Sequence, residues 1–209
     1  MAVDGGATAE ISAFLRLHKL NLQFITNTHS HTDHTTGDKA LKQASGGMAF
    51  TAFMSAEKKQ FPLDGGTVRV FRTPGHSSDS VVFQAGNTLL TGDTLFNGTI
   101  GNCFSGDMHG FFLSLKALAA FPEETVIYAG HDYVAASMAF ARHLEPENKD
   151  IDVYLSNYTP THVRSTLLDE LNVNPYLRYN SPAIVRLLES RGLQVATEYE
   201  RWESLMSIA

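Results

Sequence analysis

The strongest constraint on this chain is the segment at residues 28–34, THSHTDH, which directly follows the apolar run at residues 22–25. It places three histidines and one aspartate within six consecutive positions. Histidine nitrogens and carboxylate oxygens are the usual protein ligands of zinc and similar transition metals. Side chains two positions apart on extended backbone point to the same side, so His29 and His31 can aim at one point. The last two ligands follow after the chain turns, and the two groups together predict two neighbouring metal ions.

Three further candidate ligands share one pattern, in which an apolar run ends in a glycine and then a ligand-type residue. They are His76 after residues 68–72, Asp93 after residues 88–91, and His131 after residues 126–129. Glycine lets the backbone turn sharply or approach another group closely, and α/β folds place their binding sites at strand ends. A single histidine or aspartate after a glycine is usually a turn or capping residue. Four such strand ends in one chain predict that the seven side chains meet in one metal centre.

Composition limits the classes of partner. The 209 residues are 43% hydrophobic, which suffices for one large domain or for one domain with an appendage. The net charge of -6 argues against general nucleic-acid binding, and no apolar stretch approaches the roughly 20 residues that cross a bilayer. The single cysteine, Cys103, excludes an intrachain disulfide, and the first residues lack a secretory signal. We therefore expect a cytoplasmic protein that has neither nucleic acid nor a membrane as a partner.

Apolar periodicity predicts a mixed α/β core followed by a helical region. Strands are expected over residues 23–26, 48–53, 68–72, 80–84, 88–91 and 125–129. Helices are expected over residues 8–19, 39–44, 109–120, 134–144, 165–171, 183–189 and 196–206. We therefore divide the chain into a metal-binding core at residues 1–132 and a mainly helical C-terminal region at residues 133–209.

The order of the candidate ligands resembles that of the metallo-β-lactamase superfamily, whose signature T-H-x-H-x-D-H precedes a distant histidine, aspartate and histidine. The resemblance covers residues 3–131. It implies an α/β fold, a four-layer αββα sandwich with two sheets face to face, helices outside and the metals at one sheet edge. It also implies the metal ligands: His29, His31 and His76 for one ion, Asp33, His34 and His131 for the other, and Asp93 bridging both.

Other segments are similar to glyoxalase II, also called hydroxyacylglutathione hydrolase, a family that hydrolyses S-lactoylglutathione. They are TGDTLF at 91–96, GHDY at 130–133, FARHLEPEN at 140–148, and residues 165–178. The resemblance implies a thioester hydrolase whose C-terminal helical extension contributes to substrate binding. It places Tyr133 and Arg178 at glutathione-contacting positions. Asn102 and Phe104 align with the family segment G-C-G-[KR]-x-[YF]-x-G, so an amide replaces its cation and a phenyl ring offers no hydroxyl to the substrate.

This set of donors suits two divalent metal ions, zinc foremost, with iron or manganese as alternatives. Two such ions lower the pKa of a shared water from about 15.7 to near 7 and polarise a carbonyl. We therefore expect attack by a metal-bridging hydroxide, with Asp33 and Asp93 as the catalytic side chains beside the metal-bound water. A thiol, whose pKa is near 8.5, departs as thiolate without a dedicated general acid. A small-molecule thioester is therefore the expected substrate.

Two alternatives stay open. A persulfide dioxygenase has the same fold and would use a single iron held by His29, His76 and Asp93. Its family carries an arginine after a glycine-cysteine-glycine step, and this chain lacks that arginine. A non-catalytic metal-binding relative would have lost some ligands, whereas all seven are present.

The start of the chain predicts an exposed sheet edge. Residues 3–6, VDGG, resemble the V-D-P-G end of an early family strand that other strands normally precede, so we expect the N-terminal strands to be shortened. An exposed sheet edge tends to pair with another chain. We therefore expect either a homo-oligomer or another feature of the chain that compensates for this edge.

Overall fold

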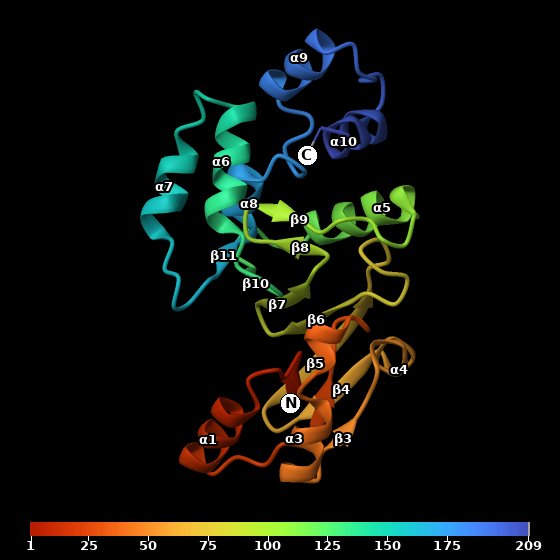
Figure 1. Ribbon diagram of the computed structural model, residues 1–209, viewed down its shortest axis with the longest axis vertical. Helices are drawn as coiled ribbons and strands as arrows, with labels where there is room; N and C mark the ends of the chain where they lie inside the picture. The colour runs from red at the N-terminus through yellow and green to blue at the C-terminus, as the bar shows by residue number, and fades with distance from the viewer. Residues whose placement is uncertain (209) are drawn as a thin grey trace.

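Within residues 1–208, which the computed structural model describes, two β-sheets form the centre and helices cover their outer faces (Figure 1). The first sheet is parallel and has the strand order β1 (Ala2–Val3), β2 (Phe24–Thr26), β3 (Met48–Ala49). The second sheet has the order β11 (Ser165–Thr166), β10 (Val126–Ala129), β7 (Thr88–Gly92), β6 (Val81–Ala85), β5 (Gly66–Arg72), β4 (Gln60–Leu63). A small hairpin pairs β8 (Leu95–Phe96) with β9 (Thr99–Ile100).

The helices lie in two groups on opposite sides of these sheets (Figure 1). On the side of the first sheet are α1 (Thr8–His18) and α3 (Asp38–Ser45). Beyond the second sheet are α5 (Met108–Ala119), α6 (Val134–Leu144), α7 (Asp150–Asn157), α8 (Leu167–Val173), α9 (Pro182–Ser190) and α10 (Glu198–Met206). Two short helices, α2 (Thr32–Thr35) and α4 (Ala52–Lys58), follow β2 and β3. None of the helices in the described chain is long and apolar enough to cross a bilayer.

Strand alternation sends neighbouring side chains into different layers, because successive residues of a strand point to opposite faces. In β2, Phe24 packs in the same cluster as Phe83 of β6, whereas Ile25 packs with Leu41 of α3. In β6, Val82 faces away from Phe83 and joins the cluster beneath the C-terminal helices. The layers are therefore helix, sheet, sheet, helix, which confirms the predicted αββα sandwich.

The C-terminal region shares its core with the first part of the chain. Trp202 of α10 and Leu167 of α8 pack in one cluster with Leu89 of β7 and Ile127 of β10. Strand β11 also extends the second sheet by pairing antiparallel with β10. The boundary at residue 132 stays a prediction, and the two parts are joined by a common core and a common sheet.

Side-chain caps explain where several helices begin. Thr166 and Asp169 form a capping box at the start of α8, and Thr197 and Glu200 form another at the start of α10. A cap also explains one wrong prediction, the strand over residues 48–53. Only Met48–Ala49 is a strand, because the Thr51 side chain accepts a hydrogen bond from the Met54 amide and starts α4.

Candidate metal centre

Strand directions explain how distant parts of the chain meet at one edge of the second sheet. Strand β6 is antiparallel to both β5 and β7, and β10 is parallel to β7. The carboxyl ends of β5, β7 and β10 therefore lie at the same edge. The loops after them carry His76, Asp93 and His131, and the segment after β2 brings the remaining four predicted ligands. Within residues 1–208 the structure places all seven side chains in one cluster.

The first group consists of His29, His31 and His76, whose ring nitrogens converge. The His31 Nδ1 atom lies 2.9 Å from His29 Nε2 and 3.0 Å from His76 Nε2. Three ring nitrogens this close cannot all satisfy one another through shared protons. A cation about 2 Å from each nitrogen would satisfy all three, which is the usual zinc–histidine distance.

The second group consists of Asp33, His34 and His131. The Asp33 Oδ2 atom lies 3.2 Å from His131 Nε2 and 3.8 Å from His34 Nε2. His34 is buried, whereas the Asp33 side chain is 59% exposed. This group therefore faces the solvent through its carboxylate.

Asp93 lies between the two groups. Its Oδ1 atom is 3.3 Å from His34 Nε2, and its Oδ2 atom is 3.5 Å from His76 Nε2 and 3.6 Å from His131 Nε2. The carboxylate thus contacts members of both groups, as a bridging ligand would. Burial opposes ionisation of Asp93, but the adjacent His34 and the other imidazoles outweigh burial and lower the pKa of the carboxyl group.

Unsatisfied polar atoms show that this set of residues fits a metal ion. In the described chain, His34 Nε2 and Asp93 Oδ1 are buried and neither makes a hydrogen bond of normal geometry. Burying such atoms without partners is costly, and metal coordination is one way to satisfy them. The donors are imidazole nitrogens and carboxylate oxygens, which suit zinc, iron and manganese.

A network around the cluster fixes which nitrogen of three imidazoles, those of His29, His34 and His76, points inward. The Asp4 carboxylate lies 2.9 Å from His34 Nδ1 and accepts hydrogen bonds from the amide and the hydroxyl of Thr28. The Thr28 hydroxyl lies 3.0 Å from His29 Nδ1, and the Asn102 carbonyl lies 3.0 Å from His76 Nδ1. If each Nδ1 donates its proton to these partners, each Nε2 presents a lone pair to the cluster.

Sequence reasoning did not identify Asp4 or Thr28 as part of the centre. Asp4 belongs to the VDGG segment, which resembles a family strand end and was the available signal. The carboxylates of Asp4 and Asp93 have a large effect on His34. Burial alone would lower the pKa of His34, but these carboxylates outweigh burial and raise it to about 10. In contrast, burial and the neighbouring His34 lower the pKa of His29 to about 4.

Two of the predicted glycines are necessary for the close approach of these groups. A Cβ atom at Gly130 would overlap Asp93 Oδ1 and lie 2.8 Å from His34 Cε1. Gly92 has φ +50, and a Cβ atom there would overlap the Thr28 side chain. The glycine before each of these ligands therefore has a packing reason in addition to a turn.

Two exposed aromatic rings flank the cluster on different sides. The Phe104 ring is 68% exposed and lies 5.3 Å from the ring of His76 and 5.9 Å from that of His31. The Tyr133 ring is 48% exposed and stacks on His131 at 5.5 Å. Phe104 and Tyr133, two of the four predicted substrate contacts, thus lie next to the candidate ligands.

The other two predicted substrate contacts are arranged differently. Asn102 is exposed, and its backbone carbonyl faces His76. Arg178 forms a two-pronged ion pair with the buried Glu145, from Nε at 2.7 Å and Nη2 at 2.9 Å, and its Nη1 contacts the Leu171 carbonyl. Within residues 1–208 no hydrogen bond or ion pair links Arg178 to the cluster. Its substrate role stays a prediction, and the contacts of its guanidinium are structural.

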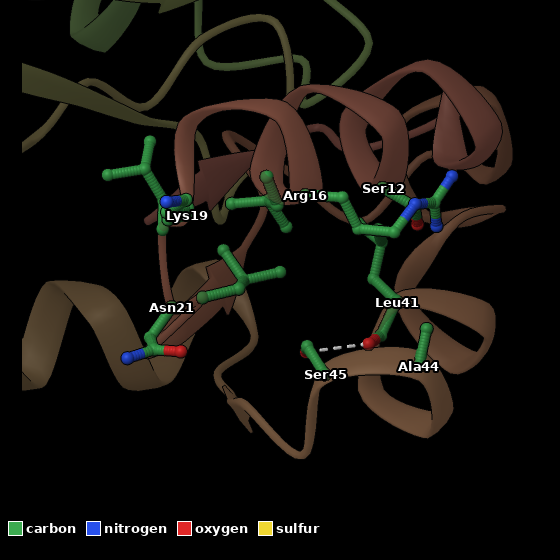
Figure 2. A pocket seen from close by; sticks show the side chains of 10 residues that line it. Ser12, Arg16, Lys19, Asn21, Leu41, Ala44 and Ser45 are labelled. Atoms are coloured by element: carbon green, nitrogen blue, oxygen red, sulfur yellow. Dashed lines mark hydrogen bonds between the residues drawn. The ribbon is translucent and has the colours of Figure 1, made fainter.

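A separate cleft of about 520 Å³ lies between α1 and the end of α3, on the outer side of the first sheet (Figure 2). Arg16, Lys19 and Asn21 line it on one side and Leu41 and Ser45 on the other. None of the candidate ligands belongs to this cleft. It is therefore distinct from the cluster of seven candidate ligands.

Sequence comparisons place known families along the chain. The metallo-beta-lactamase superfamily matches residues 56–131, and the family described as hydroxyacylglutathione hydrolase C-terminus matches residues 132–205. The chain is 33% identical to a hydroxyacylglutathione hydrolase of Chromohalobacter salexigens, over 91% of this chain and 82% of that protein. It is 30% identical to one of Vibrio cholerae, over 97% of this chain and 88% of that protein.

Solved structures with the same fold are more distant in sequence. ETHE1 from Myxococcus xanthus superposes with a TM-score of 0.64 at 19% identity, over 98% of this chain and 78% of that chain. The BLEG-1 B3 metallo-beta-lactamase superposes with a TM-score of 0.60 at 20% identity, over 84% of this chain and 87% of that chain. At these identities the likeness concerns the fold alone.

Proposed function

Because this chain belongs to the hydroxyacylglutathione hydrolase family of the metallo-β-lactamase superfamily, we propose that it is a metal-dependent hydrolase of thioesters. A hydroxyacylglutathione-type thioester is the first candidate substrate. The observation that carries the proposal is the convergence of seven donor side chains into two groups that share Asp93. The reaction class, hydrolysis of a thioester, is inferred from the hydroxyacylglutathione hydrolases to which the chain is similar.

We infer that the two groups hold two divalent metal ions, with zinc first and iron or manganese as alternatives. His29, His31 and His76 would hold one ion, Asp33, His34 and His131 the other, and Asp93 both. When bound, such ions lower the pKa of water and polarise a carbonyl group. The unsatisfied His34 Nε2 and Asp93 Oδ1 atoms support this assignment.

The residues around the centre would bind the substrate and handle protons. Asp33 is exposed on the open side, so its carboxylate, besides holding the second ion, would accept the proton that the metal-bound water loses before the attack. Phe104 and Tyr133 would hold the two ends of the thioester, because their exposed rings flank the two groups. The departing thiolate needs no proton donor, since a thiol has a pKa near 8.5.

One paired measurement tests this function against the persulfide dioxygenase alternative. Metal content per chain would be measured first, followed by hydrolysis of S-lactoylglutathione and oxygen uptake with a persulfide. We expect two metal ions and hydrolysis without oxygen uptake. One iron per chain, held by His29, His76 and Asp93, with oxygen uptake and no hydrolysis, would overturn the proposal. The complete second group of ligands favours the hydrolase.

We also propose that the chain forms a homo-oligomer through the outer side of the first sheet. Strand β1 is a two-residue edge strand, and α1 buries none of its side chains fully. Phe14 and Leu17 of α1 are 55% and 77% exposed. The first turn of α1 is acidic and its last turn is basic, so two copies of this helix are complementary when antiparallel. Light scattering after size exclusion should give a dimer that Leu17→Glu converts to a monomer, and a monomeric parent chain would refute the proposal.

A further inference from the structure

A completely buried carboxylate lies outside the cluster of seven candidate ligands. Glu170 of α8 is 0% exposed, and no ion pair involves it within residues 1–208. Its Oε2 atom accepts hydrogen bonds from the Gly98 amide at 2.8 Å and from Asn174 Nδ2 at 3.0 Å. Its Oε1 atom accepts one from the Tyr154 hydroxyl at 2.9 Å. Burying a carboxyl group is costly, so this arrangement needs an explanation beyond packing.

The partners of Glu170 converge on the turn of the β8–β9 hairpin. Gly98, with φ +88, is in this turn and donates to Glu170. The residue before it, Asn97, donates to the Ser165 hydroxyl at 2.7 Å. The residue after it, Thr99, offers its carbonyl to Asn174 Nδ2 at 2.9 Å. The two turn residues and the first residue of β9 are thus bound by the C-terminal region.

The same hairpin lies between two parts of the candidate metal centre. Asp93 precedes β8 by two positions, and Asn102, whose carbonyl faces His76 Nδ1, follows β9 by two positions. The Phe96 ring of β8 lies 6.0 Å from the ring of His131 and 5.0 Å from that of Tyr133. A shift of the hairpin would therefore move Asp93, His76 and His131 relative to one another.

We propose that Glu170 is a positioning residue, whose buried Oε2 acceptor holds the β8–β9 hairpin so that Asp93 and the Asn102 carbonyl are correctly placed for the metal centre. The inference rests on the metal centre of the proposed function and is independent of the identity of the thioester. The C-terminal region thereby contributes to metal binding as well as to the fold. Residues that hold metal ligands in place typically affect metal affinity by 10–100-fold.

Three substitutions in the full chain separate this role from simple stabilisation. Glu170→Met has a similar length and no acceptor for the Gly98 amide. Glu170→Gln keeps an acceptor oxygen for Gly98, because the Tyr154 hydroxyl can turn to accept a hydrogen bond from the amide group of the glutamine. Tyr154→Phe is the matched control, since it removes a hydrogen bond to the same carboxylate without touching the hairpin.

The readouts are zinc affinity by competition with a chelator and the visible absorption spectrum of the cobalt-loaded chain. We expect Glu170→Met to lose about tenfold or more in zinc affinity and to alter the cobalt spectrum. Glu170→Gln should keep the zinc affinity and the cobalt spectrum of the parent chain. Tyr154→Phe should lower the unfolding temperature without changing the zinc affinity or the cobalt spectrum. If Glu170→Met keeps the parent affinity and spectrum, or if Tyr154→Phe changes them equally, the inference is overturned.

A measurement on the unmodified chain covers the case in which Glu170→Met does not fold. Zinc loading should slow hydrogen exchange of the Gly98 amide and leave that of Phe61 in β4 unchanged. Unchanged exchange at Gly98 in a chain that binds zinc would also overturn the inference. A parent chain that binds no metal would instead refute the proposed function.

Discussion

The Nδ1 atom of His34 lies 2.9 Å from the Oδ2 atom of Asp4, although 30 positions separate the two residues in sequence. The contact holds the His34 ring so that Nε2 faces Asp93. Asp4 also binds the Thr28 amide, so one carboxylate ties the first strand to the segment that carries four of the candidate ligands. The residue that follows strand β1 is therefore part of the candidate centre.

Removing the charge of Asp4 should weaken metal binding. In Asp4→Asn the His34 Nδ1 proton loses its anionic acceptor, so we expect the pKa of His34 to fall from about 10 and zinc affinity to fall about 10–100-fold. NMR titration of the histidines and chelator competition measure the two effects. Asp64→Asn, at an exposed site, is the control, and equal losses in both variants would contradict a specific role for Asp4.

Metal binding at neutral pH should release at least one proton, because His34 must lose one and any metal-bound water that ionises adds another. In the metal-free chain the pKa of His34 is raised to about 10 and that of His29 is lowered to about 4, so near pH 7.5 only the first must lose a proton. Because a metal binds neutral imidazole, deprotonation of His34 should raise the apparent affinity by about tenfold per pH unit, and this contribution should level off above about pH 10. Calorimetry in buffers of different ionisation enthalpy measures the protons released. Zero release near pH 7.5 would contradict this expectation.

Asp33→Ala should empty the second metal position and abolish hydrolysis. The change removes the only carboxylate of that group besides Asp93, while His29, His31 and His76 remain. We expect metal content to fall from two ions to one per chain, measured by elemental analysis. Asp64→Ala, which removes an exposed carboxylate elsewhere, should keep both ions. Full turnover of Asp33→Ala with one ion would identify a mononuclear enzyme.

Asn102→Lys should improve the use of a glutathione thioester. Asn102 is exposed and contacts His76 through its backbone, so a longer cationic side chain is compatible with the structure. A charge-assisted contact contributes about 1.5–3 kcal/mol, and at an exposed site we expect about a tenfold lower KM with unchanged kcat. Steady-state kinetics with S-lactoylglutathione measure this. Asn21→Lys adds the same charge beside the cleft between α1 and α3, and the same gain there would point to overall charge instead.

Gly130→Ala should disrupt the centre by steric overlap. The added methyl group would overlap Asp93 Oδ1, so we expect loss of at least one metal ion and a lower unfolding temperature. The matched control is Gly66→Ala, where a Cβ atom meets nothing within 4 Å. Elemental analysis and thermal unfolding measure both variants. Normal metal content in Gly130→Ala would show that Asp93 can move away from this position.

Much of the fold could be predicted, because the signals are local. Apolar periodicity and glycine turns identified α1, β5, β7 and α6, the last with both ends correct. The strand expected over residues 48–53 was wrong after Ala49, since one threonine cap outweighed the β-type composition. Helix α7 was missed, because its acidic start resembles a solvated loop.

Sequence by itself determined which side chains could bind a metal and that they follow strand ends, because donor chemistry and strand–glycine patterns lie within a few residues of each other. Only the tertiary structure decided which residues contact these donor side chains and orient them. Asp4 meets His34 and the Asn102 carbonyl meets His76 only through the pairing and packing of the sheets. It also pairs Arg178 with Glu145, a contact that no motif in the sequence predicted. Such contacts depend on which strands and helices pack against one another. A local sequence pattern does not determine that packing, because the contacting residues are far apart in the chain.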